Sequence, residues 1–278
     1  MDARVLLDGL AYVESPRWHD GRLWFAHWGT DEIVAVDLQG RSEVVARGAG
    51  GLGWSIDWLP DGRLLVTGAG LRQLAADGSL ARYADLSTLA SGWNELVVDG
   101  RGNAYANGGN LDPSPSGPAG VIALVTETGE ARLVADGLAF PNGMAIAPDG
   151  RTLVVAESWA DRLTAYDVDA DFSLSGRRSW AETPGDHPDG ICFDADGAIW
   201  YADVGGRRCV RVREGGDRLE TVDLDRGAFA CMLGGPEGRD LLIAAAEWRG
   251  FEGVPGALSD RTGQVLVARA PSPRAGRP

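Results

Sequence analysis

A turn that contains glycine and leads into an apolar strand recurs six times along the chain, and no other feature of the sequence constrains the fold as strongly. The repeat reads DGRLWFAH at its first occurrence and DGAIWYADV at its fifth. Its glycines are Gly21, Gly62, Gly102, Gly150, Gly197 and Gly238, spaced 40 to 48 residues apart. A four-stranded propeller blade takes about 40–50 residues, whereas the repeat of a β-helix is far shorter. The sequence therefore predicts an all-β fold: a six-bladed β-propeller with four-stranded antiparallel blades around a central, metal-containing channel.

The composition and the chain ends fit this ring. The 40 glycines suit tight turns, and segments such as EIVAVDLQGRSEVVA are typical of a hairpin that completes each blade. The N-terminal ARVLLDG lacks a hairpin partner, so we expect it to pair with the C-terminal QVLVARA and close the ring. We expect one propeller domain over residues 1–270, a disordered tail at 271–278 and a Pro-rich loop at 108–118 over one mouth of the channel.

The charged residues exclude several classes of function. The 26 cationic residues are all arginine, against 40 Asp and Glu, for a net charge of −14. Without lysine there is no Schiff-base chemistry and no lysine phosphate loop, and the negative charge disfavours nucleic-acid binding. No apolar run is long enough for a membrane helix, and three scattered cysteines fit reduced thiols. We expect a cytoplasmic protein with a small-molecule substrate and no nucleic-acid or membrane partner.

Oxygen-bearing side chains stand seven or eight residues before the repeat glycine in five of the six repeats. They are Glu14, Ser55, Asn94 with Glu95, Asn142, and Asp189. The innermost strands of a propeller line its channel, so residues at equal offsets converge in space. Converging carboxylates repel one another unless a cation or protons neutralise them. Carboxylate and amide oxygens without Cys or His favour one hard divalent cation, for which Ca²⁺ is the first choice and Mg²⁺, Mn²⁺ and Zn²⁺ are alternatives.

Four segments resemble the SMP-30/gluconolactonase/LRE (regucalcin-like) family, blade by blade over most of the chain. They are ESPRW at 14–18, FPNGMAIAPDGRTLVVAES at 140–158, HPDGICFDADGAIWYADVGG at 187–206 and CMLGGPEGRDLLIAA at 231–245. The resemblance implies a six-bladed propeller with one central divalent cation, and lactonase activity in many members. By this likeness Glu14 matches the metal-binding glutamate, Asn142 the asparagine of the P-N-G element, and Asp189 both the P-D-G ligand and the proposed catalytic base.

The third blade departs from the family pattern. Family lactonases commonly read R-x-N-D there, whereas this chain has Gly92-Trp93-Asn94-Glu95. Asn94 matches the asparagine, Glu95 replaces the aspartate, and Gly92 replaces the arginine. The loss of a guanidinium fork removes a bidentate grip on an acidic or polyhydroxyl ligand. This departure predicts a substrate other than the usual sugar-acid lactone.

Three further residues are candidates for substrate contact. Trp54 and Trp93 stand at the channel offset, where an indole face could stack on a sugar or an apolar ring. Packing between blades is the alternative interpretation for both. His187, two residues before Asp189, could serve at the pocket rim or be a solvated loop residue.

The main hypothesis is a metal-dependent hydrolase that opens a lactone by attack of metal-activated water. Glu14, Asn142 and Asp189 would hold the cation, and Asp189 would act as general base. Asn94 would complete the coordination or, with Glu95, contact the substrate. One alternative keeps the site but acts on a neutral ester, a phosphotriester or a specialised natural product. Another is a non-catalytic propeller that serves as a binding module.

Overall fold

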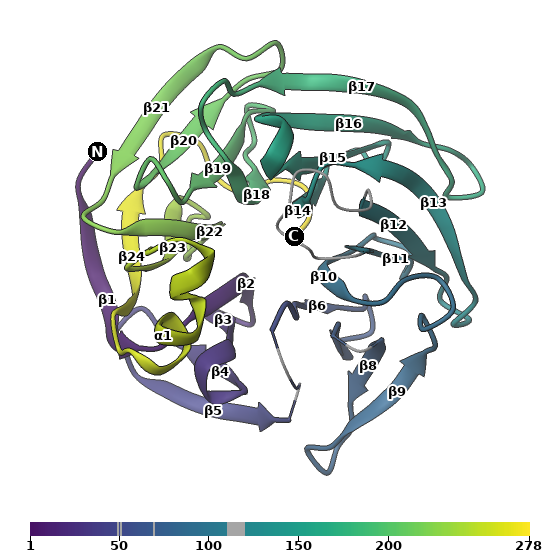
Figure 1. The fold of residues 1–278 in the computed structure, drawn as a ribbon, viewed down its shortest axis with the longest axis horizontal. Coiled ribbons are helices and arrows are strands. Elements are labelled where there is room, and N and C mark those ends of the chain that lie inside the picture. Colours follow the sequence, from purple (N-terminus) through teal and green to yellow (C-terminus); the bar gives the residue numbers. More distant parts are fainter. Residues whose placement is uncertain (49, 51, 69, 110–119) are drawn as a thin grey trace.

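Six four-stranded sheets stand around a central axis in the computed structural model (Figure 1), which confirms the predicted propeller. The structure describes residues 1–278 except 49, 51, 69 and 110–119, so most of the Pro-rich loop expected over the channel mouth lies outside the described residues. In each sheet one edge strand lies nearest the axis, and we call it the inner strand. The opposite edge strand lies at the rim.

The first three blades follow the chain in order. Blade one contains β2 (Val13–His19), β3 (Arg22–His27), β4 (Glu32–Val36) and β5 (Ser42–Arg47). Blade two contains β6 (Ile56–Trp58), β7 (Leu64–Val66), β8 (Leu71–Leu74) and β9 (Leu80–Ala84). Blade three contains β10 (Trp93–Val98), β11 (Ala104–Gly108), β12 (Gly120–Val125) and β13 (Ala131–Leu138).

The last three blades complete the ring. Blade four contains β14 (Pro141–Ile146), β15 (Thr152–Glu157), β16 (Arg162–Val168) and β17 (Leu174–Glu182). Blade five contains β18 (Pro188–Phe193), β19 (Ile199–Asp203), β20 (Arg208–Val212) and β21 (Arg218–Asp223). Blade six contains β22 (Gly227–Gly234), β23 (Asp240–Ala246), β24 (Gly263–Arg269) and, as its outermost strand, β1 (Ala3–Leu10).

The two ends of the chain close the ring, as the sequence predicted. Strand β1 pairs antiparallel with β24, with Ala3 opposite Ala268 and Val5 opposite Leu266. The N-terminal strand thus covers the outer edge of a sheet whose other three strands come from the C-terminal part of the chain.

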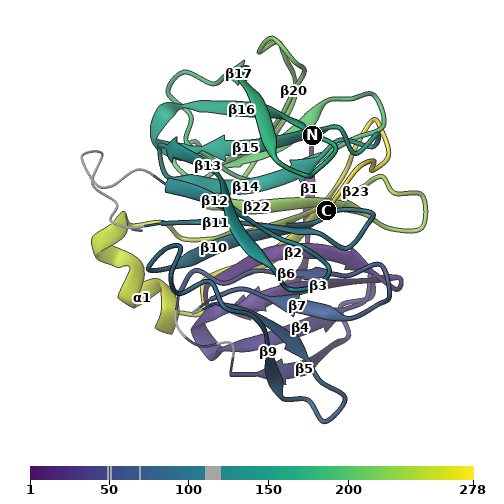
Figure 2. The same cartoon turned by 90° about the vertical axis from the view of Figure 1, so that its right-hand side faces the viewer.

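The short helical elements lie on one face of the ring, which we call the upper face. The 3₁₀ turns η1 (Trp28–Thr30) and η2 (Ser158–Ala160) each join the second strand of a blade to the third. The turn η3 (Phe251–Gly253) and the helix α1 (Val254–Ser259) do the same in blade six, and Figure 2 shows α1 projecting from this face. Because the inner strands begin where the second strands end, the inner strands start at the upper face.

Apolar side chains fill the spaces between neighbouring blades. Between blades five and six the buried cluster includes Cys192, Cys209 and Cys231, whose thiols are free. Between blades two and three, Leu65 and Leu96 are completely buried in one cluster. This packing fixes the inner strands against one another and so fixes the walls of the channel.

Residues 271–278, expected to be disordered, instead follow a defined path across the opposite, lower face. Arg274 N donates to Gly238 O of blade six at 2.7 Å, and Ala195 N of blade five donates to Pro273 O at 2.8 Å. Arg277 exchanges two backbone hydrogen bonds with Ile146 of blade four. The composition of this tail, rich in proline and glycine, suggested disorder. The backbone groups of the tail nevertheless form hydrogen bonds with three blades, and such long-range contacts cannot be predicted from composition. Among the described residues, no helix is long and apolar enough to cross a membrane.

Candidate functional site at the upper end of the channel

Four polar residues occupy the same position in four inner strands. Glu14, Asn94, Asn142 and Asp189 are each the second residue of their strand, in β2, β10, β14 and β18. In each strand the pairing register with the next strand shifts at this point, between Glu14 and Arg17 in blade one for example. A bulge of this kind re-aims side chains and interrupts the regular ladder. The same bulge in four blades therefore presents polar side chains near the upper face.

Two glycines let these strands approach closely. A Cβ atom on Gly143, after Asn142, would lie 2.5 Å from the carbonyl oxygen of Asp189 in the next blade. A Cβ on Gly190, after Asp189, would lie 2.5 Å from the Cβ of Ala230 in blade six. Any side chain would force the blades apart. The glycines of the P-N-G and P-D-G elements thus bring Asn142 and Asp189 together.

Three buried carboxyl groups at the channel, those of Glu14, Glu95 and Asp189, influence one another electrostatically. Burial, followed by the charge of Glu95, raises the pKa of Glu14 to about 8. Burial, followed by the charges of Glu14 and Glu95, raises the pKa of Asp189 well above its usual range. Both shifts have the same cause, because a low-dielectric site disfavours several negative charges at once. Without a cation, Glu14 and Asp189 therefore tend to hold protons at neutral pH.

Amide side chains continue the site from blade three to blade four. Asn94 Nδ2 donates to Asn142 Oδ1 at 3.2 Å, and Asn142 Nδ2 donates to Ser158 Oγ at 3.4 Å. Ser158 in turn donates to Pro188 O at 2.8 Å, next to Asp189. The fully buried Asn107 accepts from Glu95 N at 3.2 Å and donates to Asn142 O.

The sequence reasoning did not identify Asn107 or Ser158. Asn107 follows Ala106 in β11, and Ser158 follows Glu157 at the end of β15. Both lie outside the inner strands, so the channel offset could not select them. A polar residue at the end of an otherwise buried strand was the available signal.

Arg17 is a third residue that the sequence reasoning did not identify. It lies in β2 and is 5% exposed, and its Nη2 donates to Glu95 Oε2 at 3.1 Å and to Leu96 O at 2.7 Å. Its Nε lies 4.0 Å from Asp57 Oδ1 of blade two. The guanidinium of Arg17 therefore brings a positive charge to the channel. It comes from blade one, whereas residue 92 of blade three is a glycine. A charged residue within a buried inner strand was the signal for it.

The two channel serines have a structural role. Ser15 and Ser55 share a hydrogen bond of 2.7 Å between their hydroxyls, and Ser15 Oγ also accepts from Ile56 N at 3.0 Å. Thr67 donates to Asn94 O at 2.9 Å and accepts from Ser55 N at 2.8 Å. These bonds join blades one, two and three and leave neither serine arranged as a nucleophile beside a base.

The three other predicted contact residues lie in different surroundings. Trp54 and Trp93 are 0% and 2% exposed and belong to the apolar clusters between blades, so in this conformation they offer no face to a ligand. His187 lies at the upper rim with its side chain half exposed, and its Nδ1 is 3.0 Å from both Ser158 O and Asp161 Oδ1. The roles of all three in substrate binding stay predictions.

The polar groups at the channel fit a hard divalent cation. Asp189 Oδ1 is buried and finds no donor in the part of the chain that the structure describes. Glu14, Glu95 and Asp189 carry three negative charges when ionised, Arg17 carries one positive charge, and a divalent cation would balance the remainder. Within the same described residues, no three Asp, Glu, His or Cys side chains form a ready-made ligand cluster. The predicted set differs from such a cluster because it uses the amide oxygen of Asn142 beside two carboxylates.

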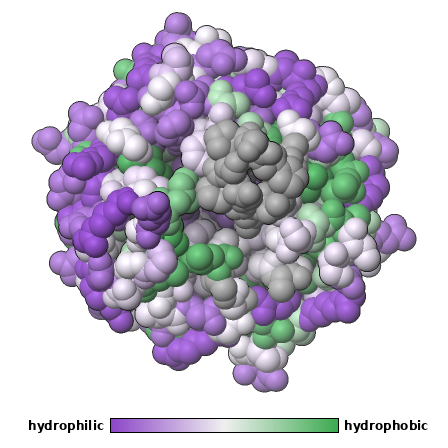
Figure 3. All heavy atoms as spheres, viewed as in Figure 1, coloured by the Kyte–Doolittle hydropathy of each residue, from purple (hydrophilic) through white to green (hydrophobic). Residues whose placement is uncertain are grey.

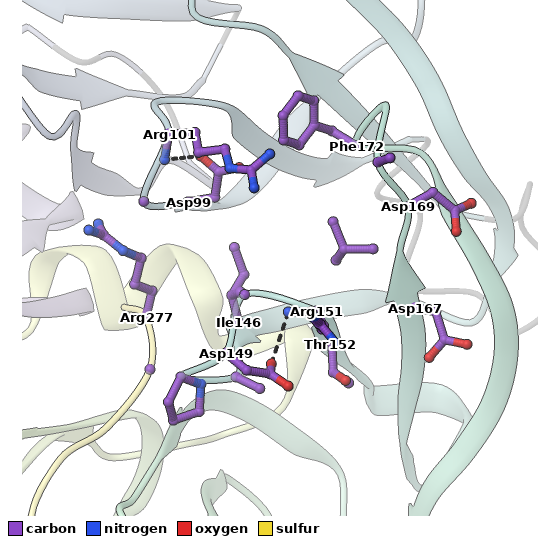
Figure 4. Close-up of a pocket in the computed structure, with 17 residues that line it drawn as sticks. Asp99, Arg101, Ile146, Asp149, Arg151, Thr152, Asp167, Asp169, Phe172 and Arg277 are labelled. Carbon is purple, nitrogen blue, oxygen red and sulfur yellow. Dashed lines mark hydrogen bonds between the residues drawn. The ribbon is translucent and has the colours of Figure 1, made fainter.

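A cavity of about 950 Å³ lies elsewhere, at the lower face between blades three and four (Figure 4). Asp99 and Asp149 line it, and their carboxylates accept from the backbone N–H of Arg101 and Arg151 at 2.8 and 2.9 Å. The guanidinium of Arg101 lies 5.3 Å from the ring of Phe172. These acidic groups serve to form turns, and none of the predicted site residues lines this cavity.

The family model described as "SMP-30/Gluconolactonase/LRE-like region" matches residues 12–247 of the chain. The chain belongs to this family. The match spans the five inner strands that begin each blade from β2 to β18 and extends through β23, so it includes every residue of the candidate site.

Curated relatives of the chain include regucalcins, a lactonase and a fluorophosphatase. Regucalcin of Xenopus laevis is 30% identical over 49% of this chain and 49% of its own length. The 6-deoxy-6-sulfogluconolactonase of Pseudomonas putida is 29% identical, over 66% of this chain and 65% of the relative. The diisopropyl-fluorophosphatase of Loligo vulgaris is 28% identical, over 63% of each. The chain spans about half the length of the regucalcins and under two thirds of the two hydrolases.

Solved structures share the fold over the full length. A luciferin-regenerating enzyme superposes with a TM-score of 0.85 at 20% identity, covering 99% of this chain and 98% of the other. A calcium-binding regucalcin from Agrobacterium tumefaciens superposes with a TM-score of 0.79 at 21% identity, covering 100% and 98%. At these identities the likeness concerns the propeller architecture alone.

Proposed function

We propose that this protein is a divalent-cation-dependent hydrolase that opens a lactone. The observation that carries the proposal is the buried Oδ1 of Asp189, which accepts no hydrogen bond from any described residue. It lies at the same level of the channel as the amide of Asn142 and the carboxyl of Glu14, whose pKa is raised. The sulfogluconolactonase among the relatives supports a lactone as the substrate class. The calcium-binding regucalcin fold neighbour supports Ca²⁺ as the ion, with Mg²⁺, Mn²⁺ and Zn²⁺ as alternatives.

Glu14, Asn142 and Asp189 would hold the cation through two carboxylates and one amide oxygen. A divalent cation there supplies Lewis acidity, which polarises an ester carbonyl and makes water easier to deprotonate. Ser158 and Asn94 keep the amide of Asn142 oriented through their hydrogen bonds to its two ends. Arg17 holds the carboxyl group of Glu95 in place through their 3.1 Å contact.

Asp189 is the residue we assign as general base. Its Oδ1 is buried and not committed to another group in the described chain, so it can accept a proton from an attacking water. The burial that isolates this oxygen also raises the pKa of Asp189, which suits a base that must accept a proton near neutral pH. Asn94 and Glu95, at the start of β10, lie beside the same channel end and would orient the substrate.

The test is a hydrolysis assay with a panel of lactones and added Ca²⁺, Mn²⁺ or Zn²⁺. Asp189→Asn should lower kcat by about a hundredfold or more, because removing a positioned base typically costs that much. Asn142→Ala should raise the concentration of cation needed for half-maximal activity, because it removes one proposed ligand. Asp217→Asn, an exposed change in the same blade with a side chain 79% exposed, is the matched control. Full activity in both channel variants would contradict the mechanism.

A neutral phosphotriester is the second candidate substrate. Gly92 removes the guanidinium that would grip an acidic or polyhydroxyl ligand, and the fluorophosphatase relative shows that this chemistry occurs in a similar chain. Parallel kinetics on lactones, aryl esters and phosphotriesters would rank these classes by kcat/KM. If no substrate is turned over and the cation still binds, the propeller is a binding module.

A further inference from the structure

Six aromatic rings form a continuous row on the upper face, which we call the aromatic arc: Tyr12, Phe229, Trp248, Phe251, Trp159 and Phe140. Successive ring centres are 4.6, 5.8, 5.2, 5.5 and 5.5 Å apart in that order. The rings belong to blades one, six and four, so the arc reaches across the ring of blades rather than following one sheet.

Both ends of the arc adjoin the candidate site. Tyr12 lies two residues before Glu14, and Phe140 lies two residues before Asn142. At the other end, Trp159 directly follows Ser158, the residue bonded to Asn142, and its ring lies 5.8 Å from that of His187.

The middle of the arc is carried by the connection between β23 and β24. Trp248 precedes η3, and Phe251 begins it. Helix α1 then anchors this connection, because Ala257 and Leu258 pack in one cluster with Tyr12 and Phe229. The connection thus holds two aromatic rings beside the channel mouth, and Figure 3 shows hydrophobic surface gathered on this face near its centre.

Part of the arc is open to a ligand. Phe251 is 44% exposed, and Phe140, Trp159 and Trp248 are only partly buried. Neighbouring rings meet at angles of 43° to 88°, the tilted and edge-to-face arrangements that aromatic groups prefer. A flat ring from a ligand could join this row in the same manner.

The polar features of the arc do not suit a polyhydroxylated ligand. Its three phenylalanines carry no hydrogen-bonding group. The guanidinium of Arg249, next to Trp248, is held by Glu247 at 2.6 Å and Asp260 at 2.9 Å.

We infer that the substrate is an uncharged ester or lactone bearing an aryl ring, which the aromatic arc binds while the ester lies at the channel. This inference rests on the proposed hydrolase function and specifies its substrate class. The arc residues are specificity-determining and are not catalytic, so their loss should change KM more than kcat.

The experiment compares dihydrocoumarin, an aryl lactone, with glucono-1,5-lactone in the Ca²⁺-loaded protein. The intact protein should show the higher kcat/KM for dihydrocoumarin. Phe251→Ala and Trp159→Leu should raise KM for dihydrocoumarin about three- to tenfold, the range expected for one aromatic contact, with kcat within about twofold. Leu133→Ala, a change at the outer edge of blade three with 42% exposure, is the matched control and should leave both parameters unchanged.

A second readout separates this inference from the proposed function. Calorimetry with 3,4-dihydro-2-quinolinone, an unreactive lactam of the same shape, measures binding without turnover. Binding that Phe251→Ala weakens supports the aromatic arc even if no ester is hydrolysed. A preference for glucono-1,5-lactone, or lactam binding that neither arc variant changes while thermal unfolding shows both folded, would overturn the inference and leave the hydrolase proposal intact.

Discussion

Arg17 of blade one donates a hydrogen bond from Nη2 to Glu95 Oε2 of blade three at 3.1 Å, with both side chains about nine-tenths buried. The same guanidinium donates to Leu96 O and approaches Asp57 of blade two. The buried guanidinium group of Arg17 therefore links three blades beneath the candidate site. It also offsets part of the negative charge that Glu14, Glu95 and Asp189 bring to the channel.

Replacing Arg17 by an uncharged residue should destabilise the protein strongly. Arg17→Met leaves Glu95 as a buried charge without its partner, and breaking such a pair typically costs about 3–5 kcal/mol. Urea unfolding of the variant should show a loss in the free energy of unfolding of this size. The double variant Arg17→Met/Glu95→Gln removes the orphaned charge and should recover most of the loss. Equal stability of the single and double variants would show that the pair is not the cause.

The metal-free protein should become less stable as the pH rises from about 4.5 to about 8. The pKa of Glu14 is raised from 4.5 to about 8 by burial and by Glu95, so the native state binds a proton in this window that the unfolded state has released. Stability from this group is complete below pH 4.5 and is lost as the pH passes 8, with a slope of up to about 1.4 kcal/mol per pH unit. Asp189 shifts in the same direction.

The measurement is urea unfolding with a chelator present at pH 5, 6, 7 and 8. Glu14→Gln should flatten the profile because the variant has no proton to lose at this position. Carboxylates with a lowered pKa, such as Glu157, change charge at more acidic pH and do not produce this slope. A profile that rises across the window, or an unchanged slope in Glu14→Gln, would contradict the assignment.

The repeat of glycine turns was enough to predict the propeller and its six blades, and the N-terminal strand without a hairpin partner predicted the closure by β1 and β24. It was also enough to place Glu14, Asn94, Asn142 and Asp189 at one level of the channel, because equal offsets in a repeating fold become neighbours in space. The bulges after these residues were not visible in the sequence, since a register shift depends on how two strands pair.

Contacts between blades were the part that could not be predicted. Arg17 meets Glu95 across 78 positions of sequence, and the tail residue Arg277 meets Ile146 across 131 positions. Trp54, just before β6, and Trp93, the first residue of β10, have the right offset, but both side chains lie in the apolar cores between blades. The number of residues between a position and its repeat glycine predicts the level of that position along the channel. Whether the side chain points into the channel or between the blades is decided by packing.

Restoring the family's arginine should widen the substrate range. Gly92 lies at the upper end of β10, two residues before Asn94, and its carbonyl accepts from Gly109 N at 3.0 Å. Gly92→Arg adds a charged donor beside the channel mouth and should raise kcat/KM for glucono-1,5-lactone about tenfold, the effect of one charge-assisted hydrogen bond. Gly92→Leu supplies bulk without charge as the control. A similar gain in both variants would attribute the effect to size.

The central claim is that Glu14, Asn142 and Asp189 bind one divalent cation, and a calorimetric titration of Ca²⁺ into the metal-stripped protein at pH 7 tests it most directly. We predict one ion per chain, with protons released because Glu14 and Asp189 must ionise to bind it. Asp189→Asn should abolish this binding, while Asp217→Asn should retain it. No binding to the wild-type protein, or unchanged binding in Asp189→Asn, would contradict the account.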